Sequence, residues 1–112
     1  MEEIIVIQGT ELKLILTISG LTDTQGNIEA NYNLEVKVFT QPKDKTILDE
    51  NRILDIEGSV NQKLLLIDTS VLTPGILNLE ITLDIPDDDF VDIDDGNRRE
   101  IYRESTNIKI IK

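Results

Sequence analysis

The sequence contains no cysteine, no histidine and no tryptophan among its 112 residues. Without cysteine the chain can form no disulfide. Without histidine it lacks the usual carrier of protons near neutral pH and the commonest metal ligand in proteins. Catalysis by a nucleophile and base drawn from cysteine and histidine is therefore excluded.

Basic residues are also scarce. The chain has 11 of them and 22 acidic residues, which gives a formal net charge of −11. Binding to nucleic acid depends on lysine and arginine displacing counterions, so a nucleic-acid partner is not expected. The same balance disfavours anionic membrane surfaces, and no apolar run approaches the eighteen or so residues of a membrane helix. We expect no membrane partner.

The start of the chain also lacks the features of a secretory signal. Acidic residues stand where a signal needs positive ones, and the apolar run that follows is short. We therefore expect synthesis in the cytoplasm, unless Met1 begins a trimmed form of a secreted domain.

Motifs of common enzyme classes are missing too. None of the four serines lies in a G-x-S-x-G turn, and no G-x-x-x-x-G-K phosphate loop is present. The acidic residues are scattered, so no pair stands out for glycoside hydrolysis. The sequence predicts a protein that is not an enzyme.

What is present begins with a long alternating segment at residues 77–85. Its apolar positions are Leu77, Leu79, Ile81, Leu83 and Ile85, and its polar positions are Asn78, Glu80, Thr82 and Asp84. A period of two predicts a strand with one buried and one solvated face, as in an antiparallel sheet. Pro86 is expected to end this strand, since proline lacks the ladder donor.

A corner precedes this strand at residues 68–75, after the apolar run 64–67. Asp68 or Thr69 can accept a backbone N–H at the start of a short helical turn. Val71 and Leu72 are expected to plug the end of the core, and Pro74 with Gly75 turns the chain. Because the corner is much longer than a two-residue hairpin loop, the strands that flank it are predicted to lie in different sheets.

Alternation and turn residues predict the remaining strands. They are expected at residues 4–8, 12–19, 32–40, 60–67 and 98–112, with two short strands rather than a helix in 46–58 and a polar loop at 21–31. Tyr32 is expected in the core. Phe39 falls on the polar side of its strand, where it sits at an edge, covers a loop or joins a contact surface. A break at 105–107 suggests a bulge or kink.

Together these signals predict an all-β fold. The expected architecture is an immunoglobulin-like, two-sheet antiparallel β-sandwich of seven or eight strands, formed by one domain over residues 1–112. A small barrel is the second choice.

The densest chemical feature is an acidic loop in which six of the nine residues 87–95 are aspartate. Carboxylates are the ligands that Ca²⁺ prefers, although the spacing does not fit an EF-hand. The candidate calcium ligands are Asp87, Asp88, Asp92, Asp94 and Asp95. A solvated loop whose charge discourages edge aggregation is the favoured interpretation, and no other cofactor is expected.

Aromatic residues are few, which limits sugar-binding platforms. Tyr102 lies near Arg98, Arg99 and Arg103 and is the better candidate for a surface contact. The simpler interpretation of these arginines is charge balance for the neighbouring aspartates.

Four features of the second half carry a resemblance to a known class. They are the corner Asp68-Thr69-Ser70-x-Leu72-x-Pro74-Gly75, the strand 77–85, the acidic excursion, and the ending Ile108-Lys109-Ile110-Ile111-Lys112. In these the chain resembles small β-sandwich structural modules of tailed-phage and prophage tail or baseplate proteins. The resemblance implies a virion component that catalyses nothing and assembles with itself or neighbouring tail proteins through edge strands and loops.

Three hypotheses follow. The first is a non-enzymatic structural or interaction module of phage or prophage type, with protein partners that include further copies of itself. Its expected edges are residues 4–8 and 108–111, where unpaired backbone groups can bind a partner strand. The second is a surface adhesion or ligand-binding sandwich with a calcium-binding acidic loop. The third is an acidic decoy that mimics DNA.

Overall fold

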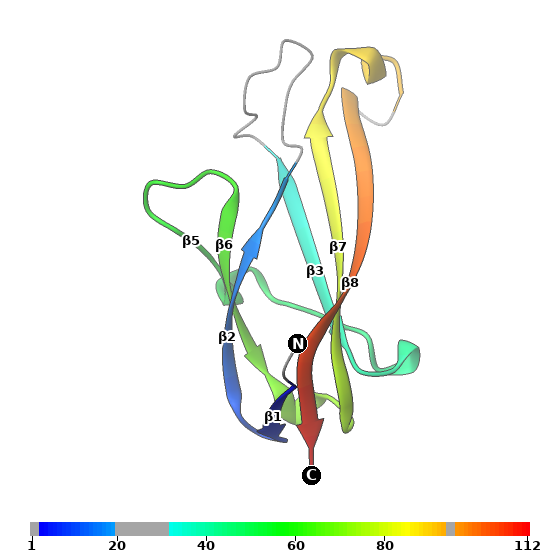
Figure 1. Ribbon diagram of the computed structural model, residues 1–112. Coiled ribbons are helices and arrows are strands. Elements are labelled where there is room, and N and C mark those ends of the chain that lie inside the picture. The colour runs from blue at the N-terminus through cyan, green and yellow to red at the C-terminus, as the bar shows by residue number, and fades with distance from the viewer. Residues whose placement is uncertain (1–2, 20–31, 94–95) are drawn as a thin grey trace.

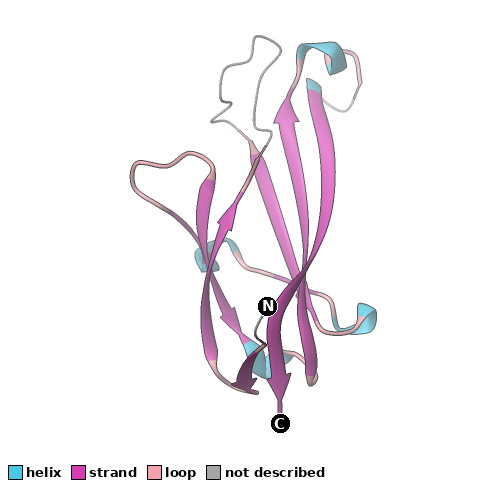
Figure 2. Cartoon of the chain, viewed as in Figure 1, coloured by secondary structure: helices cyan, strands magenta, loops and turns pink. Residues whose placement is uncertain are grey.

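The computed structural model describes residues 3–19, 32–93 and 96–112 (Figure 1). In this part of the chain strands dominate, and the only helical segments are short 3₁₀ turns (Figure 2). The strands are β1 (Ile4–Ile7), β2 (Glu11–Thr17), β3 (Asn33–Phe39), β4 (Thr46–Ile47), β5 (Ile53–Asp55), β6 (Gln62–Asp68), β7 (Gly75–Pro86) and β8 (Asn97–Ile111). The turns are η1 (Pro42–Asp44), η2 (Glu50–Arg52), η3 (Thr69–Val71) and η4 (Asp88–Phe90). No helix in the described ranges has the length and apolar content needed to cross a membrane.

The strands form two sheets. One contains five strands in the order β1-β8-β7-β3-β4, and the other contains three in the order β2-β6-β5. This agrees with the predicted all-β sandwich. The prediction of a wholly antiparallel sandwich was wrong in one respect, because β1 pairs in parallel with the end of β8. The first strand thus lies beside the last.

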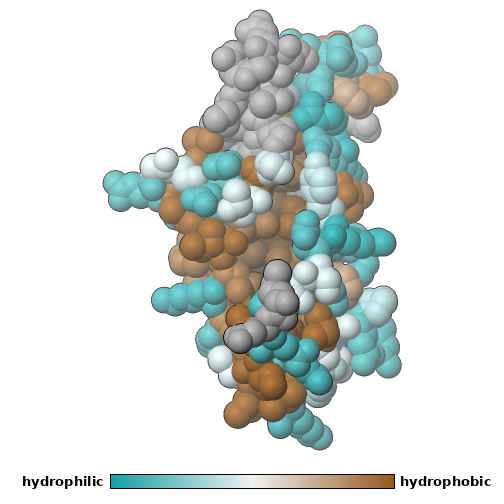
Figure 3. Space-filling model, in the orientation of Figure 1, coloured by the Kyte–Doolittle hydropathy of each residue, from teal (hydrophilic) through white to brown (hydrophobic). Residues whose placement is uncertain are grey.

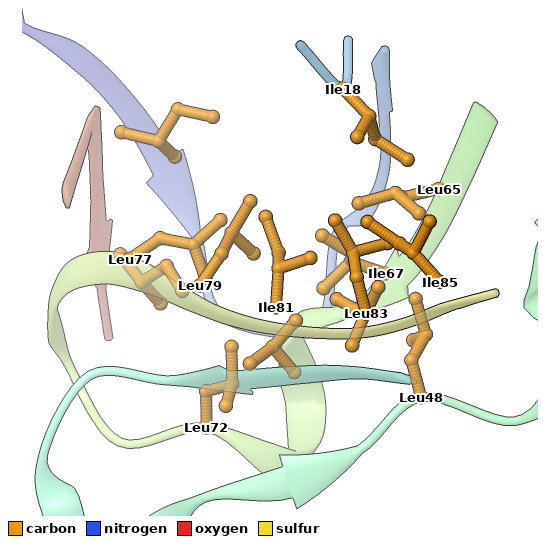
Figure 4. Packing of buried hydrophobic residues seen from close by; sticks show 14 residues of the cluster. Ile18, Leu48, Leu65, Ile67, Leu72, Leu77, Leu79, Ile81, Leu83 and Ile85 are labelled. Carbon is orange, nitrogen blue, oxygen red and sulfur yellow. The ribbon is translucent and has the colours of Figure 1, made fainter. Parts of the chain in front are cut away.

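The core lies between the two sheets and is built on β7. All five apolar positions of the alternating segment are at most 6% exposed, as the period of two predicted. Figure 4 shows Leu83 and Ile85 of β7 pointing toward Leu65 and Ile67 of β6. Burying one face of each sheet against the other removes apolar surface from water, which is the main force that holds the sandwich together.

The corner between β6 and β7 forms as expected. Asp68 accepts the backbone N–H of Ser70 at 2.9 Å and so caps η3. The two flanking strands lie in different sheets, which confirms the prediction made from the length of the corner. Leu72 fills the core at 1% exposure, but Val71 is 54% exposed, so the expectation for Val71 was wrong. Val71 ends the tight 3₁₀ turn, whose single turn cannot direct both neighbours inward.

Residues 46–58 contain two short strands, as expected, with η2 between them. β4 pairs with β3 in the larger sheet, and β5 pairs with β6 in the smaller one. This segment therefore crosses from one sheet to the other. The loop predicted at 21–31 lies outside the described residues.

The last strand is continuous, with an irregularity where the break was predicted. The register of β7 against β8 shifts between Ile76 and Asn78, so β8 has extra residues there. The Thr106 hydroxyl donates to the Leu77 carbonyl at 2.8 Å and accepts the Ile108 N–H at 3.1 Å. One side chain thus satisfies backbone groups that the bulge removes from the ladder.

The prediction of the sheet edges was half right. β1 is an edge of the larger sheet, as expected. The segment 108–111 was also expected to be an edge, but β1 pairs with all four of its residues. The preceding part of β8, residues 97–107, pairs instead with β7 alone among the described strands.

Candidate functional site

The side of the sandwich between β2 and β8 is open. Within the described strands, β2 pairs only with β6, and β8 pairs only with β7 over residues 97–107. Between these two free edges lies a trough with a volume of about 330 Å³. Its walls include Ile15, Ile18, Ile81, Leu83, Tyr102 and Glu104. We call this feature the open trough.

The open trough has an apolar floor and an exposed rim. Ile81 and Leu83 of β7 form part of the floor and are 4% and 1% exposed, whereas Ile15 and Tyr102 at the rim are 65% and 42% exposed. Figure 3 shows apolar surface in this region, between β2 and β8, and again around β1. An apolar trough between unpaired strand edges suits an extended peptide, which gains backbone hydrogen bonds and side-chain burial together.

A row of hydrogen-bonded side chains on β8 borders the open trough. Arg98 donates from Nη1 to Asp87 Oδ2 at 2.7 Å and from Nε to Glu100 Oε2 at 2.8 Å. The Tyr102 hydroxyl donates to Glu100 Oε1. Tyr102 pairs in register with Ile81, so its ring lies on the face of β8 that faces the core.

The hydrogen bonds within this row shift the pKa values of Tyr102 and Glu100. The hydrogen bond to Glu100 raises the pKa of Tyr102 and keeps its phenol protonated. The hydrogen bond from Tyr102 lowers the pKa of Glu100, against the effect of burial and with further help from Arg98. The row therefore holds Tyr102 in place as a hydrogen-bonded phenol at the rim.

The outer face of the larger sheet buries a carboxylate that the sequence did not single out. Glu80 is 9% exposed, although it occupies a polar position of the alternating segment. Lys45 Nζ lies 2.6 Å from Glu80 Oε2, and Arg103 Nη2 lies 3.7 Å from Oε1. The hydrogen bond from Lys45 lowers the pKa of Glu80, so the carboxylate stays charged.

Phe39 belongs to the same cluster. It is 9% exposed, and Lys45 Nζ lies 5.1 Å from the centre of its ring, within cation–π range. The sequence left three roles open for Phe39. The one that fits is covering a loop, because its ring contacts Lys45 in the segment that follows β3. In the sequence, the signal of this cluster was an aromatic residue, Phe39, at a polar position of an alternating strand.

The predicted calcium ligands do not form a cluster where the structure describes them. The Asp87 carboxylate pairs with Arg98 and also accepts the Asp89 N–H at 3.0 Å, so both of its oxygens have partners. Asp88 and Asp92 are exposed, and Asp94 and Asp95 lie outside the described residues. Over residues 3–19, 32–93 and 96–112, no group of three or more carboxylates is placed to hold a metal ion.

Tyr102, predicted as a surface contact, is brought by the structure to the rim of the open trough. Of the three neighbouring arginines, Arg98 pairs with Asp87 and Glu100, and Arg99 Nε lies 3.0 Å from Asp84 Oδ1. This fits the simpler interpretation of these arginines, which was charge balance.

Comparison with known proteins gives no relative. No family model, curated protein or solved structure matches the chain.

Proposed function

We propose that the chain is a non-enzymatic structural or interaction module with an immunoglobulin-like topology. In the strand naming of that fold, the order β2-β6-β5 corresponds to B-E-D, and β8-β7-β3 corresponds to G-F-C. The strand order supports this reading. The first strand departs from the constant-type arrangement, since β1 lies beside β8 rather than beside β2.

This departure is the basis of the proposal. In a constant-type domain the first strand covers the edge of the second. Here β2 lacks that partner among the described strands, and the edge of β8 at residues 97–107 is open as well. Two free edges beside an apolar trough can bind a strand from another protein chain by β-augmentation.

The resemblance to tail and baseplate modules suggests the setting. Such a module would be part of a phage or prophage virion, with further copies or neighbouring tail proteins as partners. The alternative of a calcium-dependent adhesion domain gains no support from Asp87, because Arg98 already neutralises its carboxylate.

The experiment is co-expression of the chain with the proteins encoded beside its gene, followed by gel filtration with light scattering. We expect a complex that the rim variant Ile15→Asp weakens at least tenfold, because a charge at the rim must be desolvated on binding. Val91→Asp is the control, since Val91 is 71% exposed in the acidic loop and does not line the open trough. A complex that forms equally well with Ile15→Asp would refute a role for the open trough, provided that thermal melting shows both variants folded.

A further inference from the structure

We propose that β1 is a self-association site, at which two copies of this chain pair their β1 strands antiparallel about a two-fold axis. The inference rests on the proposed function and names its first partner, a second copy. It concerns the outer edge of the larger sheet rather than the open trough.

β1 is an apolar edge strand without charged or proline residues, although its Ile7 carbonyl already accepts the Thr10 N–H at 3.1 Å and the Thr10 hydroxyl at 2.6 Å. Its four residues are Ile-Ile-Val-Ile, and Ile4, Ile5 and Ile7 are 52%, 61% and 63% exposed. The strand has no charge and no proline, and its register with β8 is regular. Soluble proteins rarely leave such an edge uncovered, because it pairs readily with another strand.

The other edges in the described part of the chain are less suited to pairing with a second copy of themselves. β4 has two residues and lies between η1 and η2, and β5 has three residues and ends in Asp55. β2 carries Glu11 and Lys13, and the free part of β8 carries five charged residues. Short length and charge both make pairing of such an edge with its own copy less favourable. β1 therefore differs from every other described edge.

Charge also favours β1 for self-association. With a net charge of −11, two copies repel each other on most approaches. β1 is uncharged, and Lys109 is the one charged residue in the segment of β8 that pairs with it, residues 108–111. Two copies that meet at β1 thus avoid placing their acidic surfaces together.

The ends of β1 are complementary in an antiparallel pair. Because β1 and β8 run parallel, with Ile4 opposite Ile108 and Ile7 opposite Ile111, Glu3 lies at one end of the pair and Lys112 at the other. A two-fold axis brings the Glu3 end of each copy to the Lys112 end of its partner. Opposite charges then lie at the same end of the interface, one strand apart, at both of its ends.

Such an interface is closed. The same strand serves both copies, so the contact is isologous and stops at a dimer. It joins the two five-stranded sheets into one continuous sheet.

The absence of cysteine allows a direct test, because one introduced cysteine is the only thiol. Disulfides require Cα atoms about 4.4 to 6.8 Å apart, a distance typical of facing residues in neighbouring strands. We expect Ile5→Cys to form a covalent dimer under mild oxidation at low protein concentration. Ile47→Cys is the matched control, since Ile47 is 57% exposed on β4, the opposite edge of the same sheet. Equal cross-linking of the two variants would overturn the inference.

Charge reversal gives a second, independent test. We expect Glu3→Lys and Lys112→Glu each to weaken dimerisation roughly tenfold in sedimentation velocity, because each disrupts two symmetry-related charge pairs. The double variant should recover the wild-type affinity. A double variant no tighter than either single change would contradict the proposed geometry.

The outcomes separate this inference from the proposed function. A wild-type chain that stays monomeric up to millimolar concentration would overturn the β1 dimer. The proposed function would still stand if Ile15→Asp abolished binding to neighbouring proteins, and it would fail if that variant had no effect.

Discussion

At the scale of single residues, Asp44 joins two distant parts of the described chain through its carboxylate. It accepts the backbone N–H groups of Thr40, Gln41 and Thr73 at 3.0 to 3.1 Å and the hydroxyls of Thr40 and Thr73 at 2.8 Å. Thr73 belongs to the corner between β6 and β7, 29 residues away. One carboxylate thus fastens the turn after β3 to the corner that begins β7.

We expect Asp44→Ala to destabilise the protein by about 2 to 4 kcal/mol, because the backbone donors of Gln41 and Thr73 lose a charged acceptor. Urea unfolding followed by circular dichroism measures this change. Asp49→Ala is the control, since Asp49 is exposed and its side chain makes no capping hydrogen bond to η2. Its effect should stay within about 0.5 kcal/mol. Equal losses for the two variants would refute the anchoring role.

Asp44 also makes the free energy of unfolding depend on pH. Burial raises its pKa, but the hydrogen bonds from Gln41, Thr73 and Thr40 outweigh burial and hold the pKa far below its ordinary value of 3.8. Because the pKa is lower in the folded than in the unfolded chain, the stabilisation is complete above about pH 4. It is lost as the pH falls below 3.8 toward the folded pKa.

The free energy of unfolding should therefore decline between pH 4 and pH 2, and less steeply in Asp44→Asn, which has no carboxyl to protonate. Asp68 and Glu80 retain part of the slope, because their pKa values are also lowered. Urea titrations at several pH values measure both slopes. Identical slopes for wild type and Asp44→Asn would contradict this assignment.

At the scale of elements, the corner also secures the connection between β1 and β2. Thr69 is fully buried, and its hydroxyl donates to the Thr10 carbonyl at 2.8 Å and accepts the Gly9 N–H at 2.9 Å. Gln8 adds a bond from Nε2 to the Leu72 carbonyl at 2.6 Å. The 3₁₀ turn η3 therefore holds the chain where it passes from one sheet to the other.

We expect Thr69→Val to cost about 1 to 3 kcal/mol, because the shape is kept while the Gly9 N–H and the Thr10 carbonyl lose a buried partner. Thermal unfolding measures the loss. Val71→Thr is the matched control, since it makes the reverse exchange at an exposed position of the same turn. A control as destabilised as Thr69→Val would show that the hydroxyl bonds do not matter.

The elements themselves were largely predictable, because alternation depends on local sequence. The segment 77–85 gave its buried face correctly, and the polar residues 105–107 marked the bulge. The predictions that were wrong concern contacts between strands that are distant in sequence. As part of the last strand, the segment 108–111 was expected at an edge, yet β1 covers it. Glu80 has the position of a solvated residue, yet it is buried and pairs with Lys45. The open trough was unpredictable for the same reason, since it depends on which strand β1 joins.

At the scale of the whole molecule, the position of the first strand decides the available surfaces. By pairing with the end of β8, β1 covers neither β2 nor the earlier part of β8, which are edges among the described strands, and becomes an apolar edge itself. The acidic loop and the charged faces repel like molecules elsewhere. We therefore propose that association takes place on this side of the sandwich.

The most direct measurement is the mass of the species in solution, by gel filtration with light scattering, for the chain alone and for the chain purified with the proteins encoded beside its gene. We expect complexes of fixed stoichiometry, a dimer of the chain that Ile5→Lys dissociates and a mixed complex that Ile15→Asp dissociates. A single monomeric species under both conditions would contradict assembly through this side of the molecule.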